Sequence, residues 1–290
     1  MRFQLKNEHL KIELSDLGAE LQSIEKEGQE YLWQADEKYW PEHAPVLFPF
    51  VGRQTDGKFT VEGQEYHQEI HGFARHFSFD MVNKTESRIV FSLKDDKHTR
   101  EMYPWHFELR ISYMIEDNRI MITYRAENLS RETMYFGIGG HPGFCLPLEK
   151  NLKFEDYYLK FGGKCTPDRI GITDAGFLSG INSPYPLEGR CNLALRHDLF
   201  DHDAIVLQNM ADQVTLKSDK GKRSVTVSYP DMPYLGIWHN PYTEAPFVAI
   251  EPWASLPARQ DIVEEFRYRP DYIRLKAGQV YINQWSITVE

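Results

Sequence analysis

Four short stretches of this 290-residue chain place a polar, chemically capable side chain beside apolar residues and a chain-breaking glycine or proline. They hold Arg53 in "FPFVGRQ", His71 in "IHGFAR", His141 in "GIGGHPGF" and Glu251 in "PFVAIEPW". A carboxylate and an imidazole together are suited to general acid–base catalysis, in which one group takes a proton and the other delivers one. We therefore treat these four residues as the candidate site.

Glu251 follows five consecutive apolar residues and precedes Pro252. The run "PFVAI" predicts a strand that is buried on both faces, with the glutamate at its end. Burial raises the pKa of a carboxyl group toward neutrality, which produces a base able to accept a proton near pH 7. The structural alternative is a glutamate that is capped by a backbone amide or paired with an arginine such as Arg259.

His141 lies directly between "GIGG" and Pro142. Glycines allow close backbone approach, so they would clear space beside the imidazole, and the proline would fix the chain after it. A histidine held in this way suits proton transfer because its ordinary pKa is about 6.5. His71 before Gly72 has the same character. For both, the alternative is a structural histidine at a strand end.

Other patterns in the sequence are weaker. His67 and His71 in "HQEIH" lack the H-E-x-x-H order, and they lie in strand-like sequence, where positions i and i+4 are far apart; this argues against a zinc protease. A cupin-type metal site would normally show a compact H-x-H pair, which the chain lacks. The segment "HDLFDHDA" is rich in histidine and aspartate, and its plainest interpretation is a solvated loop.

The elements that must position these residues are mostly strands. In "HFELRISYMI" apolar side chains alternate with polar ones, and "RSVTVSY" and "YINQWSITVE" repeat this pattern, which is typical of half-buried strands. Helical patterns are limited to short turns in "ADEKYW" and "DKHTREMY". Residues 145–200 are the least regular part and are expected to form long loops with short strands. The sequence predicts an all-β fold, a large antiparallel sandwich or barrel.

Composition narrows the class of protein further. The net charge of −10 disfavours binding to nucleic acid, whose phosphates it would repel. The three cysteines are widely spaced and form no C-x-x-C pair, which fits reduced thiols in a cytoplasmic protein. No uncharged apolar run reaches the length of a membrane helix, and the N-terminus has no signal-peptide core. We expect a cytoplasmic protein with neither nucleic acid nor a membrane as a partner.

The order of the motifs resembles the aldose 1-epimerases, or galactose mutarotases. "FPFVGR", "HGFAR", "YPWHF", "GGHPGF" and "IEPW" follow one another as in that family, and the resemblance extends to the C-terminal "KAGQVYINQWSITV". The short N-terminal region and "IEPWASLP" look most like the compact bacterial branch associated with lactose-operon-type proteins. The resemblance implies one aldose 1-epimerase-like β-sandwich domain over residues 1–290, with an open sugar cleft on one sheet.

The resemblance also implies roles for individual residues in the interconversion of the α and β anomers of an aldose. Glu251 matches the general base, His141 the general acid, His71 the second active-site histidine and Arg53 the arginine that binds the sugar. The glycines before His141 would make room for the sugar ring. Residues expected to contact the sugar by hydrogen bonds or an apolar face are Asp203 or Asp201 in "FDHDAIVL", and Trp238, Phe73 and Trp253.

A sugar would be the small-molecule partner in this interpretation, and the resemblance implies no metal and no other cofactor. It leaves a homodimer open. Three alternatives stay open beside it. A hexose-6-phosphate mutarotase would need extra cationic side chains, for which Arg75 is a candidate. A non-catalytic sugar-binding or sensing protein would keep the sandwich and lose one proton-transfer group. A metal-dependent, cupin-like enzyme is the third.

Overall fold

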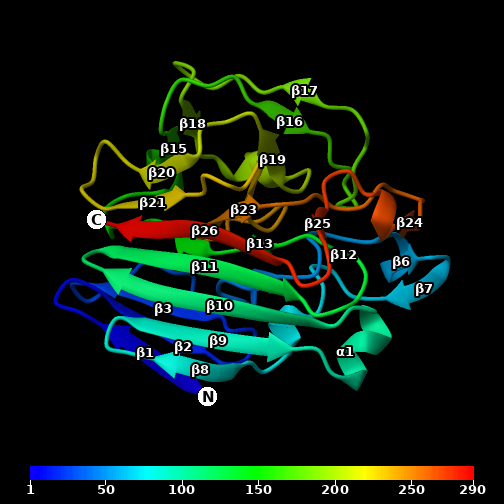
Figure 1. The fold of residues 1–290 in the computed structure, drawn as a ribbon. Coiled ribbons are helices and arrows are strands. Elements are labelled where there is room, and N and C mark those ends of the chain that lie inside the picture. Colours follow the sequence, from blue (N-terminus) through cyan, green and yellow to red (C-terminus); the bar gives the residue numbers. More distant parts are fainter.

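The computed structural model describes residues 1–290, and its largest element is a nine-stranded antiparallel sheet (Figure 1). Its long central strands are the ones that carry the clearest alternation of apolar and polar residues. In spatial order the strands are β18 (Asn192–Ala194), β15 (Tyr158–Phe161), β20 (Gln213–Lys217), β21 (Ser224–Ser228), β26 (Val280–Val289), β11 (Arg119–Asn128), β10 (Phe107–Glu116), β9 (Arg88–Lys94) and β8 (Asp80–Lys84).

A second, eight-stranded sheet is built from shorter and more buried strands. Seven of them form one row: β17 (Ser183–Pro184), β16 (Asp168–Ile170), β19 (Ile205–Gln208), β22 (Tyr234–Trp238), β23 (Phe247–Trp253), β13 (Gly139–Gly140) and β5 (Val46–Leu47). The eighth, β14 (Gly143–Cys145), pairs with β23 next to β13. Neighbouring strands of this sheet are antiparallel.

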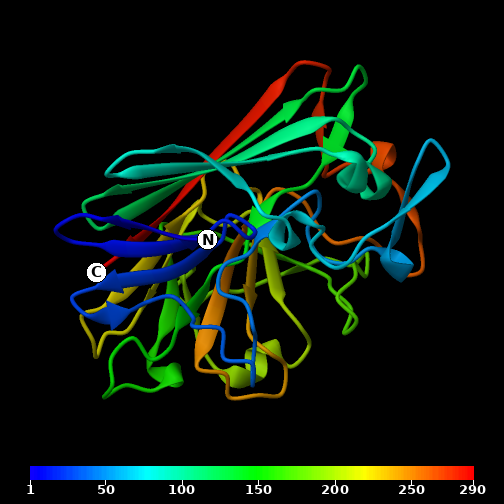
Figure 2. The same cartoon turned by 90° about the horizontal axis from the view of Figure 1, so that it is seen from below.

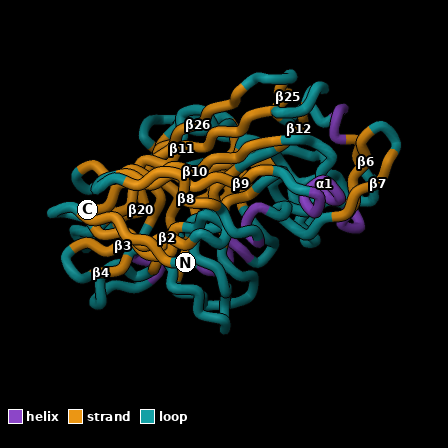
Figure 3. Tube along the Cα trace, turned by 60° about the horizontal axis from the view of Figure 1, so that its bottom comes forward, coloured by secondary structure: helices purple, strands orange, loops and turns teal.

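Smaller sheets complete the structure. The N-terminal sheet contains β1 (Arg2–Lys6), β2 (Lys11–Ser15), β3 (Leu21–Lys26) and β4 (Gln29–Glu30). The others contain β12 (Met134–Phe136) with β25 (Ile273–Leu275), and β24 (Glu264–Glu265) with β6 (Lys58–Val61) and β7 (Gln64–His67). The single α-helix, α1 (Lys97–Met102), lies at the same end of the molecule as the β6–β7 hairpin (Figure 3).

Five short 3₁₀ helices lie between the strands: η1 (Thr55–Gly57), η2 (Ala74–His76), η3 (Phe154–Asp156), η4 (His197–Phe200) and η5 (Phe266–Tyr268). None of the helices is long and apolar enough to span a membrane. Cys145, Cys165 and Cys191 form no disulfide.

The sheets stack as layers around one large hydrophobic core. Figure 2 shows the long strands from β8 to β11 and β26 above the N-terminal strands and the strands that surround β23. The core cluster comprises 65 buried residues drawn from both layers. This arrangement confirms the predicted all-β fold, and the molecule is a large antiparallel β-sandwich.

The alternation seen in the sequence explains which face of each long strand enters the core. In β10 the buried apolar side chains are Phe107, Leu109, Ile111, Tyr113 and Ile115. Val225, Val227 and Tyr229 at β21, and Trp285, Ile287 and Val289 in β26, are likewise buried, as predicted.

Of the two short helical segments expected from the sequence, one is present. "DKHTREMY" forms α1, which Asp96 caps by accepting a hydrogen bond from the Thr99 N–H at 2.8 Å. "ADEKYW" forms a single turn over residues 37–39, in which the N–H groups of Tyr39 and Trp40 donate to Asp36 O at 2.9 and 3.0 Å, and it does not continue into a helix. Residues 145–200 contain short strands and long connections, as expected.

Candidate functional site

The eight-stranded sheet presents one face to the main core and the other to a pocket. In β23, Val248 and Ile250 belong to the main core, whereas Phe247 and Trp253 belong to smaller apolar clusters on the opposite side. Because side chains alternate along a strand, Glu251 also projects to that opposite side. Trp238 of β22 shares this side of the sheet.

The pocket on this face has a volume of about 280 Å³. Ligand pockets of small molecules typically measure about 300–1,000 Å³, so this one suits a ligand of one ring. Its lining comes from eight separate segments of the chain: Trp40, Glu42, Gly52, Arg53, Ile70, His71, Arg75, His141, Ile172, Gly176, Asp203, Ala204, Val206, Trp238, Glu251, Trp253 and Pro257. The pocket therefore contains all four residues from which the sequence analysis began.

Sheet register brings His141 and Glu251 together. Gly139 pairs with Trp253 and Gly143 pairs with Ala249, so His141, midway between the two glycines, falls opposite Glu251. The imidazole Nε2 lies 3.1 Å from the carboxylate Oε2. The rest of the chain buries both side chains, since His141 is 7% and Glu251 1% exposed. No arginine pairs with Glu251; Arg259 pairs instead with Glu264 at 2.8 Å.

Glu251 lies inside its strand, whereas the sequence analysis placed it at the strand end. β23 continues through Pro252 to Trp253. On the side of β13 and β14, the N–H of Ile250 donates to Pro142 O and that of Ala254 donates to Ile138 O. The N–H missing from Pro252 falls between these two bonds, where the pairing of β23 is interrupted between Gly139 and Gly143. A proline is therefore tolerated there.

The glycines before His141 make room for tryptophans, which corrects the expectation that they make room for a sugar. A Cβ on Gly139 would lie 2.8 Å from Cδ1 of Trp253, and one on Gly140 would lie 2.6 Å from Cζ2 of Trp285. Both distances are shorter than the separation of two carbon atoms in van der Waals contact, so neither glycine can be replaced without a shift of the tryptophan. Trp253 lines the pocket, so Gly139 acts on the site through the position of that ring.

Burial shifts the proton affinities of the central pair in opposite directions. It raises the pKa of Glu251 well above the usual carboxyl value, and the nearby Asp203 carboxylate raises it further. Burial lowers the pKa of His141 to about 3. The imidazole is surrounded by aromatic rings, with the Trp40 ring centroid at 4.6 Å and those of His71 and Trp238 at 5.5 and 5.7 Å.

The second histidine, His71, has a fixed tautomer when neutral. The backbone N–H of Gly52 donates to its Nδ1 at 3.0 Å, so the proton of the neutral ring lies on Nε2. Burial lowers the pKa of His71 well below its ordinary value, and the neighbouring His141, Arg75 and Arg53 lower it further. The ring is thus a neutral hydrogen-bond donor. Its backbone has a positive φ of 66°, followed by Gly72 at 73°.

Two of the predicted sugar-binding residues lie near each other in the pocket. A Cβ on Gly176 would lie 3.1 Å from Asp203 Oδ2 and 3.3 Å from Arg53 Nε, so both side chains converge on that glycine. Burial raises the pKa of Asp203, which Arg53 partly opposes. Trp238 and Trp253 contribute aromatic surface to the same pocket.

Two sequence-predicted contacts lie elsewhere. Asp201 is not part of the pocket; its Oδ1 accepts the N–H of Tyr242 at 3.0 Å. Of the two aspartates left open by the sequence, only Asp203 lines the pocket. Phe73 is buried in the core, where it packs against Phe48 and Phe107. Gly72 turns the chain after His71, so the two side chains point to different sides.

The sequence analysis missed Trp40 and Glu42, which come from the connection between β4 and β5. "YWPEHAP" combines an aromatic ring and a carboxylate around a proline, the same kind of signal that marked Glu251. Arg75, noted only as a phosphate candidate, pairs with Glu42 at 3.0 Å.

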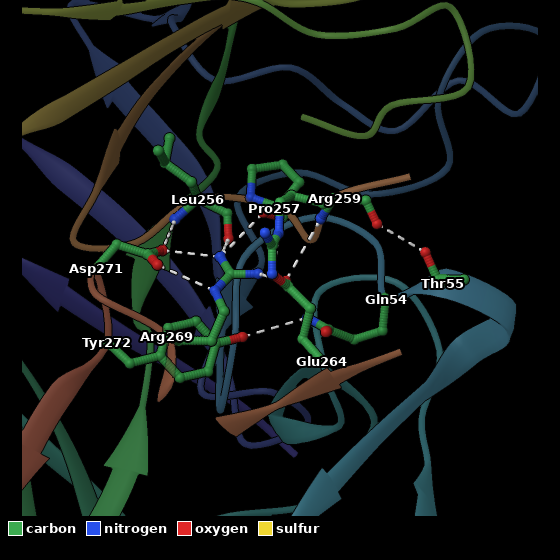
Figure 4. A network of polar contacts seen from close by, with 9 residues as sticks. All are labelled: Gln54, Thr55, Leu256, Pro257, Arg259, Glu264, Arg269, Asp271 and Tyr272. Atoms are coloured by element: carbon green, nitrogen blue, oxygen red, sulfur yellow. Dashed lines mark hydrogen bonds and ion pairs between the residues drawn. The ribbon is translucent and has the colours of Figure 1, made fainter. Parts of the chain in front are cut away.

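A buried ion-pair network holds the chain that follows Glu251 (Figure 4). Arg269, 3% exposed, contacts Glu264 and Asp271 and donates to the carbonyl oxygens of Leu256 and Pro257 at 2.7 and 2.9 Å. Pro257 lines the pocket, so the network supports one wall of it.

A larger groove exists elsewhere but lacks comparable chemistry. It measures about 840 Å³ and lies between the β6–β7 hairpin and residues 129–132. Its only histidine, His106, is 56% exposed in its side chain. No group of three or more His, Cys, Asp or Glu side chains in the molecule is arranged to hold a metal ion.

Comparison with known proteins shows the family to which the chain belongs. The family model of aldose 1-epimerase matches residues 1–288. Chromosomal and plasmid LacX proteins of Lactococcus lactis subsp. lactis are 35% and 36% identical over 266 residues, covering 88% of each chain. The structure of a galactose mutarotase related enzyme from Lactobacillus acidophilus superimposes with a TM-score of 0.95 at 37% identity, over 100% of this chain and 97% of that chain.

A galactose mutarotase-like protein from Lactobacillus casei ATCC 334 is also similar, with a TM-score of 0.93 at 29% identity and all of both chains covered. The match to the family model extends over nearly the whole chain, and the relatives share its fold throughout. The protein therefore belongs to the aldose 1-epimerase family, whose members are isomerases that act on sugars.

Proposed function

We propose that this protein interconverts the α and β anomers of an aldose, with Glu251 as the general base and His141 as the general acid. The observation that carries the proposal is the 3.1 Å contact between His141 Nε2 and Glu251 Oε2 inside a pocket of single-ring size. The two oxygens that exchange protons, O1 and the ring oxygen, are attached to the same carbon. An acid and a base that serve them must therefore be close neighbours.

Ring opening would proceed by two coupled proton transfers. Ionised Glu251 takes the proton of the O1 hydroxyl while protonated His141 gives its proton to the ring oxygen, and the bond between C1 and the ring oxygen breaks. Rotation about C1–C2 then presents the other face of the aldehyde. In ring closure His141 takes the proton back and Glu251 returns one to O1. Each proton-transfer group is worth about 10²–10⁴-fold in rate.

Burial favours the products of the opening step. The step converts a charged pair, carboxylate and imidazolium, into a neutral pair, carboxylic acid and imidazole. The pKa of Glu251 is raised and that of His141 is lowered to about 3, so the neutral pair is the stable form in this environment. Both forms contain the same number of protons, and the pair acts as one unit.

The other pocket residues would orient the sugar. His71 donates from Nε2, because Gly52 occupies its Nδ1. Arg53 and Asp203 supply donors and acceptors for hydroxyl groups. Trp238 and Trp253 offer apolar faces to the C–H surface of the ring. Both proton-transfer groups are present in one pocket, which favours catalysis over a purely sugar-binding role.

The test is anomer exchange measured by NMR or polarimetry on freshly dissolved α-D-glucose and α-D-galactose. Galactose is included because of the mutarotase-related structures among the relatives. The expected result is equilibration much faster than the buffer-catalysed rate, unchanged by EDTA, since Glu251 and His141 carry out every proton transfer of the proposed reaction. No acceleration with any aldose would refute the proposal, and loss of activity with EDTA would indicate a metal.

A further inference from the structure

One ion pair in the pocket has no part in the proton transfers. Arg75 Nη1 donates to Glu42 Oε2 at 3.0 Å, and Arg75 Nε lies 3.1 Å from His76 Nε2. The side chains are 12% and 29% exposed, so the pair is largely withdrawn from solvent. Both residues line the candidate pocket.

Hydrogen bonds fix the backbone at both Glu42 and Arg75. The N–H groups of His43 and Ala44, directly after Glu42, donate to Glu20 Oε1 at 3.0 Å. Arg75 belongs to η2, whose Ala74 N–H donates to Phe48 O at 3.1 Å. The pair is therefore part of the folded pocket rather than a chance contact of two long surface side chains.

An unpaired arginine in a sugar pocket would attract a phosphate or carboxylate, because its planar fork binds such groups through two hydrogen bonds. Here Arg75 already donates from Nη1 to Glu42, and its Nε lies beside His76, so two of its three nitrogens are engaged. Burial raises the pKa of Glu42, whereas Arg75 lowers it, so the carboxylate depends on the arginine for its charge. An anionic ligand that displaced Glu42 would leave a buried carboxylate without a partner, which is costly.

The other charged residues of the pocket do not offset the cost of displacing Glu42. The ionisable residues of the pocket other than histidine are two cations and three acids: Arg53, Arg75, Glu42, Asp203 and Glu251. Burial raises the pKa of Asp203, and the nearby Arg53 partly opposes that rise. With Glu251 in the neutral form that burial favours, these two cations face two carboxylates, so an added anion would meet no net positive charge in the pocket.

We propose that Glu42 is a specificity-determining residue which neutralises Arg75 and reserves the pocket for uncharged aldoses over sugar phosphates. The inference deepens the proposed function and rests on it for the identity of the ligand. It assigns the choice between a neutral and a phosphorylated aldose to one ion pair, and Glu42→Gln should weaken the preference for the neutral aldose while keeping the shape of the side chain.

The first experiment compares kcat/KM for anomer exchange of D-glucose 6-phosphate and D-glucose, together with a calorimetric titration of inorganic phosphate. In the unmodified protein we expect the phosphate-to-glucose ratio to be at most about 0.1 and inorganic phosphate not to bind. In Glu42→Gln the ratio should rise about tenfold or more, which corresponds to about 1.4 kcal/mol, and phosphate should compete with glucose.

Two further variants make the test specific. Adding Arg75→Gln to Glu42→Gln should abolish the gain, because the freed arginine provides it. Glu69→Gln is the matched control: it removes the same charge from an 82% exposed side chain that contacts His76 but does not line the pocket, and it should leave the ratio unchanged.

The proposal is overturned if the unmodified protein uses the phosphate as well as glucose, which needs no variant to establish. It is also overturned if folded Glu42→Gln gains nothing, or if its gain survives Arg75→Gln. Failure of the proposed function is a different result, namely no exchange of any sugar. In that case the phosphate titrations still decide whether Glu42 keeps anions away from Arg75.

Discussion

His141 and Glu251 occupy opposing register positions of two antiparallel segments, and their side chains meet with Nε2 and Oε2 3.1 Å apart. The residues lie far apart in the chain, yet the pairing of Gly139 with Trp253 and of Gly143 with Ala249 leaves them no other relative position. A pair placed by sheet register is more rigidly positioned than one carried by loops. A substitution of either residue should therefore change the surroundings of the other.

Glu251→Gln should abolish most of the anomer exchange. The amide has nearly the shape of the acid but cannot accept the O1 proton, so we expect the rate to fall by at least about 10²-fold. The fold should be retained, because the variant removes an ionisable group that the interior holds at a raised pKa. NMR exchange measures the rate and circular dichroism the fold. Glu127→Gln is the control. Glu127 forms an ion pair with Arg125 at 2.9 Å, and its variant should keep full activity. Near-normal turnover of Glu251→Gln would mean that another group is the base.

The dependence of kcat/KM on pH should differ from that of an ordinary histidine enzyme. Both reactive forms of the pair hold the same protons. Lowering the pH adds a second proton to the pair, on His141, whose pKa is about 3. Raising the pH removes the single remaining proton from Glu251, whose pKa is raised. Activity should stay flat as the pH falls from about 7 to about 5, with the acid limb near 3 rather than near 6.5. A decline centred near pH 6.5 would indicate that the pair titrates like exposed groups.

The sequence predicted the strands well because their signal is local. The buried apolar residues of β10 lie two positions apart, and this period depends only on which face meets the core. The motifs of His71, His141 and Glu251 were also found locally, since each combines a polar side chain with a glycine or proline that shapes the chain around it.

What the sequence could not supply is the set of neighbours that long-range pairing creates. Trp40 packs against His141 and Glu42 pairs with Arg75, but each contact joins a loop to a segment that only the fold brings near. The end of β23 was misplaced for a similar reason. A proline usually signals a strand end, and Pro252 is tolerated here because the pairing of β23 with β13 and β14 is interrupted at this position.

Asp203→Asn and Asp201→Asn should separate the two aspartates. Asp203 lines the pocket beside Arg53, so loss of its charge should weaken sugar binding and raise KM about tenfold, the cost of roughly one hydrogen bond to a charged group. Asp201 instead accepts the N–H of Tyr242 outside the pocket, and its variant should leave KM unchanged. Initial rates over a range of sugar concentrations measure both. A larger effect at Asp201 would reverse the assignment.

Arg269→Met should destabilise the fold by roughly 3–5 kcal/mol, because it leaves the buried Asp271 carboxylate without its cation and the buried Glu264 carboxylate with Arg259 alone. Urea unfolding at neutral pH measures the change in the free energy of unfolding. Arg267→Met is the matched control, since Arg267 pairs with Glu62 and Glu265 at the surface, where ion pairs contribute little. Equal stability losses for the two variants would show that the network of Figure 4 is not what holds this segment.

Gly72→Ala should impair catalysis although residue 72 contacts no proton-transfer group directly. Gly72 has a φ of 73°, and an added Cβ would lie 2.3 Å from the carbonyl oxygen of Phe48. The backbone must shift, and it would carry His71 away from the Gly52 N–H that fixes its tautomer. A displacement of about 1 Å near reacting groups costs up to about 10²-fold in rate. We expect kcat to fall by at least about tenfold, with a loss of stability.

Gly63→Ala separates that effect from backbone strain alone. Gly63 also has a positive φ, 79°, but it lies in the β6–β7 hairpin, where an added Cβ meets nothing within 4 Å. Its variant should lose only about 1–2 kcal/mol of stability, from the left-handed backbone, and keep its kcat. The two proteins are compared by anomer exchange and urea unfolding, and by ¹⁵N NMR of the His71 ring, whose Nδ1 should be the unprotonated nitrogen in the unmodified protein and in Gly63→Ala. Equal kcat values for the two variants would show that the backbone at Gly72 does not position His71 for the reaction.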